Sequence, residues 1–126
     1  MLFERDAFKK SKAFKFEEWI SMEIKENLFK SDRHNSFYLS AGPEEGELII
    51  MTHGWPELSL SWRHQLKFLG EIGYHVVAPD MRGYGRSSVY KNHEAYSQRE
   101  INIDMVELFD SLGKEVGYLC TFYKFL

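Results

Sequence analysis

The sequence has one cysteine, three prolines and no apolar run of membrane-spanning length. A single cysteine, Cys120, excludes an intrachain disulfide and a metal site built from several cysteines. The longest apolar stretches are far shorter than the about 20 residues that a transmembrane helix needs. Charges interrupt the first thirty positions throughout, which argues against a secretory signal. We therefore expect a cytoplasmic protein with no membrane span, no metal and no other cofactor.

The chain also lacks an excess of charge of either sign. It has 16 basic and 19 acidic residues, a formal net charge of −3, and no block of like charges. Nucleic-acid binding therefore has little support, and we expect no such partner. Hydrophobic residues make up 44% of the 126 positions and aromatic residues 16%. This composition argues against disorder and is enough for the core of one domain.

Strand and helix patterns alternate along the second half of the chain. The apolar runs at 48–52 and 74–78 are typical of strands buried on both faces, as in a parallel sheet. Helical patterns follow at about 60–69 and at 97–112, the second opened by a capping box formed by Ser97 and Glu100. Because the order is strand, helix, strand, helix, strand, it predicts an α/β fold with a mostly parallel sheet.

Further local signals complete the expected elements. Apolar positions at helical spacing predict a helix over 15–29, and residues 36–40 are typical of a strand. Glycine and proline predict a turn at 42–46. Gly70 and Gly113 are expected to end the two later helices, Gly70 as the left-handed residue of a helix terminus.

The first motif with chemical potential is HGWP at residues 53–56, which follows the buried strand 48–52. Loops at the carboxyl ends of parallel strands are where α/β sheets bind ligands. Gly54 allows close approach of the backbone, and a backbone N–H there can stabilise a developing oxyanion by about 2.7–4 kcal/mol. An ordinary strand-to-helix turn would explain the glycine and the proline equally well.

The second motif is PDMRGYGRSS at residues 79–88. Its glycines predict a tight loop, in which Asp80 accepts hydrogen bonds from backbone N–H groups and Arg82 pairs with a carboxylate. The glycine spacing fits neither a dinucleotide-binding loop nor a P-loop. We therefore interpret this motif as a structural loop, carried by Asp80, Arg82, Gly83 and Gly85.

Together with SWRHQ at 61–65, the two motifs resemble the epoxide-hydrolase branch of the α/β-hydrolase superfamily over about residues 33–115. The resemblance implies the N-terminal part of an α/β-hydrolase fold. It also implies an aspartate nucleophile at a Gly-x-Asp-x-Gly elbow, lid tyrosines that protonate the epoxide oxygen, and a histidine with an acid partner that activates water. The substrate class it implies is small apolar epoxides.

The same resemblance assigns a role to the first motif. Carried over by position, the oxyanion-hole donor is the backbone N–H of Trp55. His53, Gly54 and Pro56 complete the motif, and the Trp55–Pro56 bond is expected to be cis.

The chain departs from the family pattern where the elbow is due, just after Glu115. Neither Gly-x-Asp-x-Gly nor Gly-x-Ser-x-Gly occurs in it, so no nucleophile, catalytic acid or catalytic histidine is assigned. We expect an arm at 1–30 that is helical in part, a partial α/β-hydrolase domain at 31–115, and a tail at 116–126 outside the family pattern. The expected origin of that tail is a retained intron, a frameshift or a misplaced gene boundary.

No local residue is expected to replace the missing groups. His53 belongs to the oxyanion side, and His75 lies in a predicted buried strand as a core residue. His34, His64 and His93 are expected in loops or on helix surfaces without an acid partner. Nothing beside Cys120 indicates a reactive thiolate.

Two kinds of function remain open. One is an epoxide-hydrolase-like protein that is truncated and inactive alone, with a haloacetate-dehalogenase-like enzyme as a neighbouring class. The other is a catalytically dead binding module. An unpaired sheet edge and the aromatic segment 116–126 predict poor folding and self-association through the exposed sheet. Alternatively, this segment takes the place of the missing nucleophile strand.

Overall fold

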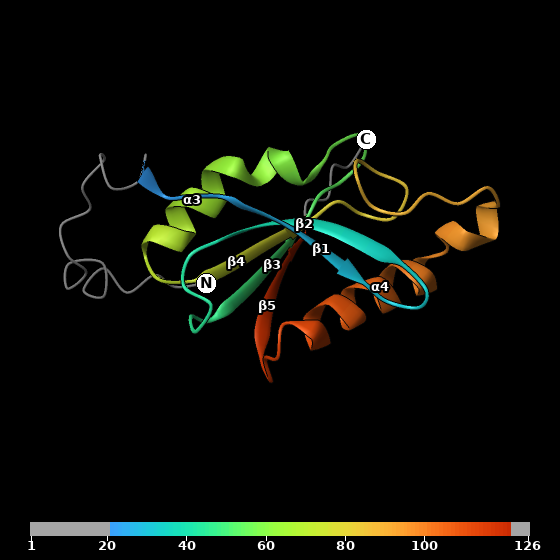
Figure 1. Cartoon of the computed structure of the whole chain (residues 1–126). Helices are drawn as coiled ribbons and strands as arrows, with labels where there is room; N and C mark the ends of the chain where they lie inside the picture. Colours follow the sequence, from blue (N-terminus) through green and yellow to red (C-terminus); the bar gives the residue numbers. More distant parts are fainter. Residues whose placement is uncertain (1–20, 122–126) are drawn as a thin grey trace.

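The computed structural model describes residues 21–121, which form a five-stranded sheet with a helix on each face (Figure 1). The elements in chain order are β1 (Lys25–Lys30), β2 (Asn35–Ala41), β3 (Leu48–Thr52), the 3-10 turn η1 (Ser59–Trp62), α3 (Arg63–Glu71), β4 (His75–Pro79), the 3-10 turn η2 (His93–Tyr96), α4 (Gln98–Ser111) and β5 (Gly117–Thr121). None of these helices is long and apolar enough to cross a membrane.

The strands lie in the order β1-β2-β4-β3-β5. β3 runs parallel to both β4 and β5, whereas β2 is antiparallel to β1 and β4. The predicted α/β class and the parallel β3–β4 pair are therefore confirmed, and the complete sheet is mixed.

Alternation along the strands divides the core into two layers. In β4, Val76 and Ala78 pack on the α3 side with Leu66, whereas Val77 packs on the α4 side with Leu108. All five side chains are completely buried. Burial of a side chain of this size contributes about 1.5–3 kcal/mol, so the two helices fix the sheet from both faces.

The predicted helix over 15–29 is wrong in its second half, where β1 lies, and residues 15–20 fall outside the described residues. β1 pairs with β2 over its whole length, with Leu28 opposite Phe37. The apolar positions fit a helix or a strand, and the free edge of β2 decides between them because it supplies backbone partners.

The glycine predicted to end α3 is also misassigned. Gly70 lies inside α3, where a Cβ would come within 2.9 Å of the Gly42 nitrogen. A residue without a side chain is therefore required there, because the helix packs closely on the turn after β2. The left-handed residue is Gly73, with φ +105°. Gly113 does follow α4 as predicted, with φ +66°.

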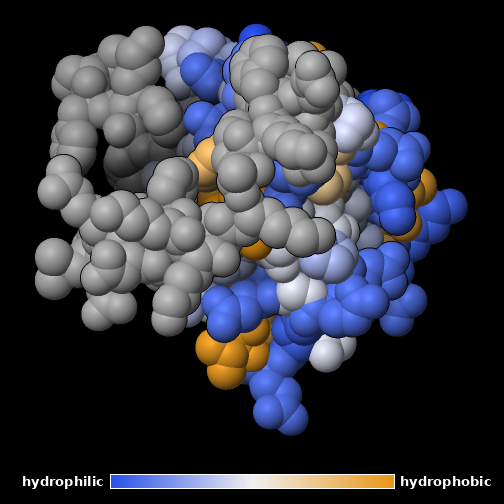
Figure 2. Space-filling view, turned by 90° about the vertical axis from the view of Figure 1, so that its left-hand side faces the viewer, coloured by the Kyte–Doolittle hydropathy of each residue, from blue (hydrophilic) through white to orange (hydrophobic). Residues whose placement is uncertain are grey.

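The C-terminal segment supplies a third parallel strand. β5 pairs with β3 from Leu48–Gly117 to Thr52–Thr121, as in the alternative in which this segment takes the place of the nucleophile strand. Every residue of β5 is exposed, and no other described strand pairs with its outer edge. On the face in Figure 2 the described surface is largely hydrophilic, with hydrophobic residues in small separate groups.

Candidate active site

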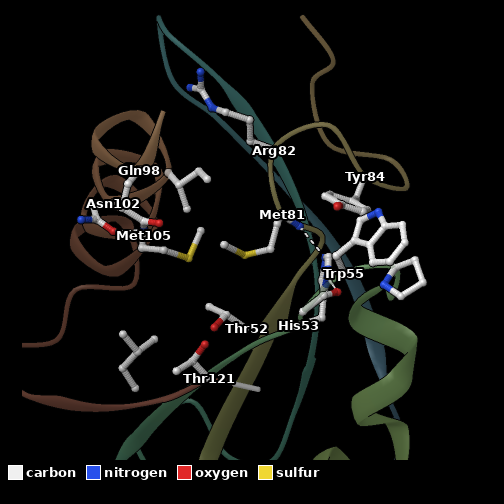
Figure 3. A pocket seen from close by; sticks show the side chains of 14 residues that line it. Thr52, His53, Trp55, Met81, Arg82, Tyr84, Gln98, Asn102, Met105 and Thr121 are labelled. Atoms are coloured by element: carbon white, nitrogen blue, oxygen red, sulfur yellow. Dashed lines mark hydrogen bonds between the residues drawn. The ribbon is translucent and has the colours of Figure 1, made fainter. Parts of the chain in front are cut away.

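A pocket of about 530 Å³ lies at the carboxyl ends of β3, β4 and β5. Figure 3 shows Met105 reaching toward it from α4, across from the loop that carries Trp55. Its lining residues are Thr52, His53, Gly54, Trp55, Pro56, Met81, Arg82, Tyr84, Gln98, Ile101, Asn102, Met105, Leu119 and Thr121. The structure thus brings the first motif together with Arg82 of the second.

The loop after β3 places the backbone of Trp55 beside this pocket. The Trp55–Pro56 peptide bond is cis, as the resemblance implied. The Trp55 side chain is exposed, and its backbone N–H donates no hydrogen bond within residues 21–121. A backbone N–H without a partner beside a concave, partly apolar surface is suited to bind an oxygen atom of a ligand or intermediate.

His53 is buried and both of its ring nitrogens are occupied by backbone groups. Nε2 accepts a hydrogen bond from the Met81 N–H at 2.9 Å, and Nδ1 lies 3.0 Å from the Gly54 carbonyl oxygen. One neutral tautomer, protonated at Nδ1, satisfies both contacts. The Tyr84 ring packs against His53 edge-on, at 5.0 Å between centroids. With both nitrogens engaged, the ring has none free to act as a base.

Asp80 anchors the second motif from a buried position. Its Oδ1 accepts a hydrogen bond from the Ser59 N–H at 2.9 Å, and its Oδ2 accepts one from the Arg86 N–H at 3.1 Å. Gly85, with φ +49°, lies so close that a Cβ would overlap Asp80 Oδ2. The carboxylate therefore joins η1 to the loop after β4.

Arg82 is held by Asp104, a residue that no sequence motif singles out. Arg82 Nε donates to Asp104 Oδ2 at 2.7 Å and Nη2 donates to Oδ1 at 2.8 Å, with side chains 3% and 1% exposed. Arg33 also donates to Asp104 Oδ1 at 3.0 Å. The sequence signal that could have identified Asp104 was its position as a carboxylate next to the apolar positions of α4. The ion pair ties α4, one wall of the pocket, to the loop after β4.

The expectation that His34 lacks an acid partner is wrong. His34 is buried, and its Nε2 lies 3.7 Å from Asp104 Oδ2. Its Nδ1 lies 2.8 Å from the Tyr90 hydroxyl, which donates to the Arg33 carbonyl. Burial lowers the pKa of His34, against the attraction of Asp104. The chain reversal between β1 and β2 brings His34 to α4, 70 residues away, and no local pattern indicates that contact.

Other candidates stay apart from any catalytic grouping. His75 is a buried strand residue, as expected, and burial lowers its pKa. Cys120 is a free, exposed thiol on β5. Between residues 21 and 121, no group of three or more His, Cys, Asp or Glu side chains is placed to hold a metal ion.

Comparison with known proteins gives a consistent result. Residues 47–119 match the alpha/beta hydrolase fold family. The chain is similar to Epoxide hydrolase A of Mycobacterium tuberculosis, with 47% identity over 77 residues, 61% of this chain and 24% of that protein. Epoxide hydrolase 1 of Siraitia grosvenorii is 36% identical over 96 residues, 76% of this chain and 30% of that protein.

Solved structures show the same likeness. The crystal structure of epoxide hydrolase VrEH1 from Vigna radiata aligns with a TM-score of 0.74 and 35% identity, covering 79% of this chain and 32% of that one. Epoxide Hydrolase A from Mycobacterium thermoresistibile aligns with a TM-score of 0.75 and 36% identity, covering 79% and 31%. The chain thus spans about a quarter to a third of the length of these relatives.

Proposed function

Because the chain belongs to the alpha/beta hydrolase fold family and resembles its epoxide hydrolases, we propose that it provides the oxyanion-hole side of an epoxide-hydrolysing site. The observation that carries the proposal is the Trp55 backbone N–H, which has no partner within residues 21–121 and lies at the pocket. His53, Gly54 and Pro56 support this donor as the rest of the motif.

The proposed chemistry has two steps. A carboxylate oxygen attacks an epoxide carbon, the ring C–O bond breaks, and the ring oxygen takes a proton from an acid, leaving a hydroxyalkyl ester. Water, deprotonated by a base, then attacks the ester carbonyl carbon, so negative charge develops on the carbonyl oxygen. The Trp55 N–H donates to this oxygen, which is worth about 2.7–4 kcal/mol in a comparable site. The diol then leaves and the carboxylate is restored.

The pocket wall suits a small apolar epoxide as the substrate. Met81, Ile101, Met105 and Leu119 contribute apolar side chains to it. Apolar walls with a few placed polar groups are typical of small-molecule sites. The proposed location of such an enzyme is the cytoplasm, with no cofactor.

We propose that these 126 residues do not turn over epoxides by themselves. They contain no Gly-x-Asp-x-Gly or Gly-x-Ser-x-Gly elbow, and both nitrogens of His53 are engaged. Incubation with styrene oxide is expected to give the same rate of diol formation as a control without protein. Turnover that a substitution of His53 or Trp55 abolishes would contradict this expectation.

The donor itself is tested by binding. Phenylacetate combines a carboxylate, which represents the nucleophile, with an apolar ring, which represents the substrate; ethylbenzene has a similar apolar group without the oxygens. In ¹⁵N-labelled protein, we expect phenylacetate to shift the Trp55 backbone amide proton downfield and ethylbenzene to leave it nearly unchanged. Equal responses to both compounds, or none to phenylacetate, would contradict the proposed donor.

A binding module is the second candidate, and the exposure of β5 favours it. Tyr118 and Leu119 are 58% and 65% exposed on a strand whose outer edge has no partner in the described part of the chain. Such an edge can pair with another chain, including a second copy of this one. Sedimentation velocity over a range of protein concentrations tests self-association through this edge. A monomer at all concentrations would contradict it.

A further inference from the structure

We infer that His53 is a positioning residue, which aims the Trp55 N–H by holding the Gly54 carbonyl oxygen. The inference rests on the proposed oxyanion-hole function of Trp55. It gives His53, which cannot be the base, a specific task at the same site.

One peptide group joins Gly54 to Trp55. This group contains both the Gly54 carbonyl and the Trp55 N–H, and it is trans, because the cis bond in this loop is the next one. In a trans peptide the carbonyl and the N–H point in opposite directions. Whatever fixes the direction of the Gly54 carbonyl therefore fixes the direction of the Trp55 N–H.

Two donors hold that carbonyl oxygen. The Glu57 N–H donates to it at 2.9 Å, closing the turn around the cis bond. His53 Nδ1 lies 3.0 Å from the same oxygen. A carbonyl oxygen has two lone pairs, so these contacts use both. The Trp55 N–H, at the opposite edge of the same planar peptide group, then points away from both donors.

The loop after β4 makes His53 a donor at the required nitrogen. The Met81 N–H donates to Nε2 at 2.9 Å, so Nε2 carries the lone pair and Nδ1 carries the proton (Figure 3). His53 is only 7% exposed, so water competes little for either contact. His53 thus transmits the position of Met81, in the loop after β4, to the donor in the loop after β3.

The same contact strengthens the donor. A hydrogen bond to an amide carbonyl polarises the peptide group, and chains of hydrogen bonds reinforce one another in a buried setting. Here the series of hydrogen bonds runs from the Met81 N–H through the imidazole to the Gly54 carbonyl and ends at the Trp55 N–H. An oxygen bound at Trp55 would extend it by one bond.

Two substitutions separate the two contacts of His53. Asparagine carries an amide N–H near the position of Nδ1, and glutamine carries an amide oxygen near the position of Nε2. His53→Asn therefore keeps the donor to Gly54 and loses the acceptor for Met81, whereas His53→Gln does the reverse. Circular dichroism is used to establish that both variants keep the fold.

The experiment measures phenylacetate binding and the Trp55 amide signal in the 126-residue chain. We expect His53→Gln to weaken phenylacetate binding about 3- to 10-fold, which is the effect of one hydrogen bond. We expect His53→Asn to weaken phenylacetate binding less than about twofold. In the ligand-free protein, the Trp55 amide proton is expected to move upfield in His53→Gln and to stay near its wild-type position in His53→Asn.

The ring nitrogens of wild-type His53 give a test that needs no variant. Their ¹⁵N shifts are expected to show a protonated Nδ1 and an unprotonated Nε2. The opposite tautomer, or equal effects of the asparagine and glutamine substitutions, would overturn the positioning role. Absence of phenylacetate binding by the wild-type chain would instead reject the proposed function, and the ligand-free signals would still decide the role of His53.

Discussion

Arg82 and Asp104 form a two-point ion pair, at 2.7 and 2.8 Å, between the loop after β4 and the middle of α4. Both side chains are almost completely buried. The pair fixes the helix that supplies Asn102 and Met105 to the pocket. Electrostatics in the core thereby position the wall opposite Trp55.

Removing one partner of this pair is expected to destabilise the fold strongly. Asp104→Asn leaves the Arg82 and Arg33 guanidinium groups without their shared carboxylate, which costs about 3–5 kcal/mol for a buried pair. Urea unfolding followed by circular dichroism measures the change.

The matched control for this prediction is Glu26→Gln, which breaks the exposed ion pair with Arg86. We expect no measurable change in the free energy of unfolding there, because solvent screens such a pair. Equal effects of the two substitutions would show that burial does not determine the value of the Arg82–Asp104 pair.

The pH dependence of stability is expected to depend on His34. Burial lowers its folded-state pKa, with Arg82 and Arg33 acting in the same direction and Asp104 and Glu107 against it. The unfolded chain then binds more protons near the ordinary histidine pKa, so stability falls as the pH drops through about 6.5 and levels off below the folded pKa. His75 contributes in the same direction.

His34→Asn tests this prediction because an amide N–H can still donate to the Tyr90 hydroxyl. Unfolding free energies from pH 8 to pH 5 should fall less steeply in the variant than in the wild type. Parallel curves would assign the pH dependence to other groups, His75 first.

Glycine is expected to be required at Gly85 for two reasons. Its φ of +49° disfavours a side chain, and a Cβ would displace the Asp80 carboxylate from its two backbone donors. Gly85→Ala is therefore expected to cost at least about 1 kcal/mol more than Gly113→Ala. Gly113 has a similar φ, +66°, but no atom within 4 Å of the position that a Cβ would take, so it controls for backbone strain. Thermal unfolding of both variants decides this.

The contribution of β5 is measured by comparing residues 1–126 with residues 1–115. β5 hydrogen-bonds to β3, whose Leu48, Ile50 and Met51 are buried. Its removal leaves the edge of β3 unpaired, so we expect the shorter chain to be less soluble and to unfold less cooperatively. A shorter chain that is as stable and as soluble would show that the segment adds nothing to the fold.

The sequence predicted those parts of the molecule whose signals are local. The buried strands at β3 and β4, the N-cap at Ser97 and the loop around Trp55 all lie in contiguous patterns, and the structure places them where expected. The Glu100 half of the predicted capping box does not form, because the Glu100 carboxylate pairs with Arg33 and the Ser97 N–H donates to the Glu94 carbonyl. Asp80 was also assigned to its structural loop because a short acidic residue in a glycine loop has nearby N–H partners.

The missed features depend on tertiary contacts. β1 is a strand because β2 offers it an edge, and Gly70 is small because α3 packs on the turn at Gly42. The Asp104 cluster joins residues 71 positions apart in the chain, Arg33 being the farthest. Spacing within a helix or strand carries no information about such pairs.

The central claim, that Trp55 donates its backbone N–H to an oxygen in the pocket, is tested most directly by a crystal structure of the chain with phenylacetate. We predict a carboxylate oxygen about 2.7–3.1 Å from the Trp55 nitrogen, with the phenyl ring against Met105 and Leu119. A carboxylate bound elsewhere, or a Trp55 N–H directed away from the ligand, would contradict the claim.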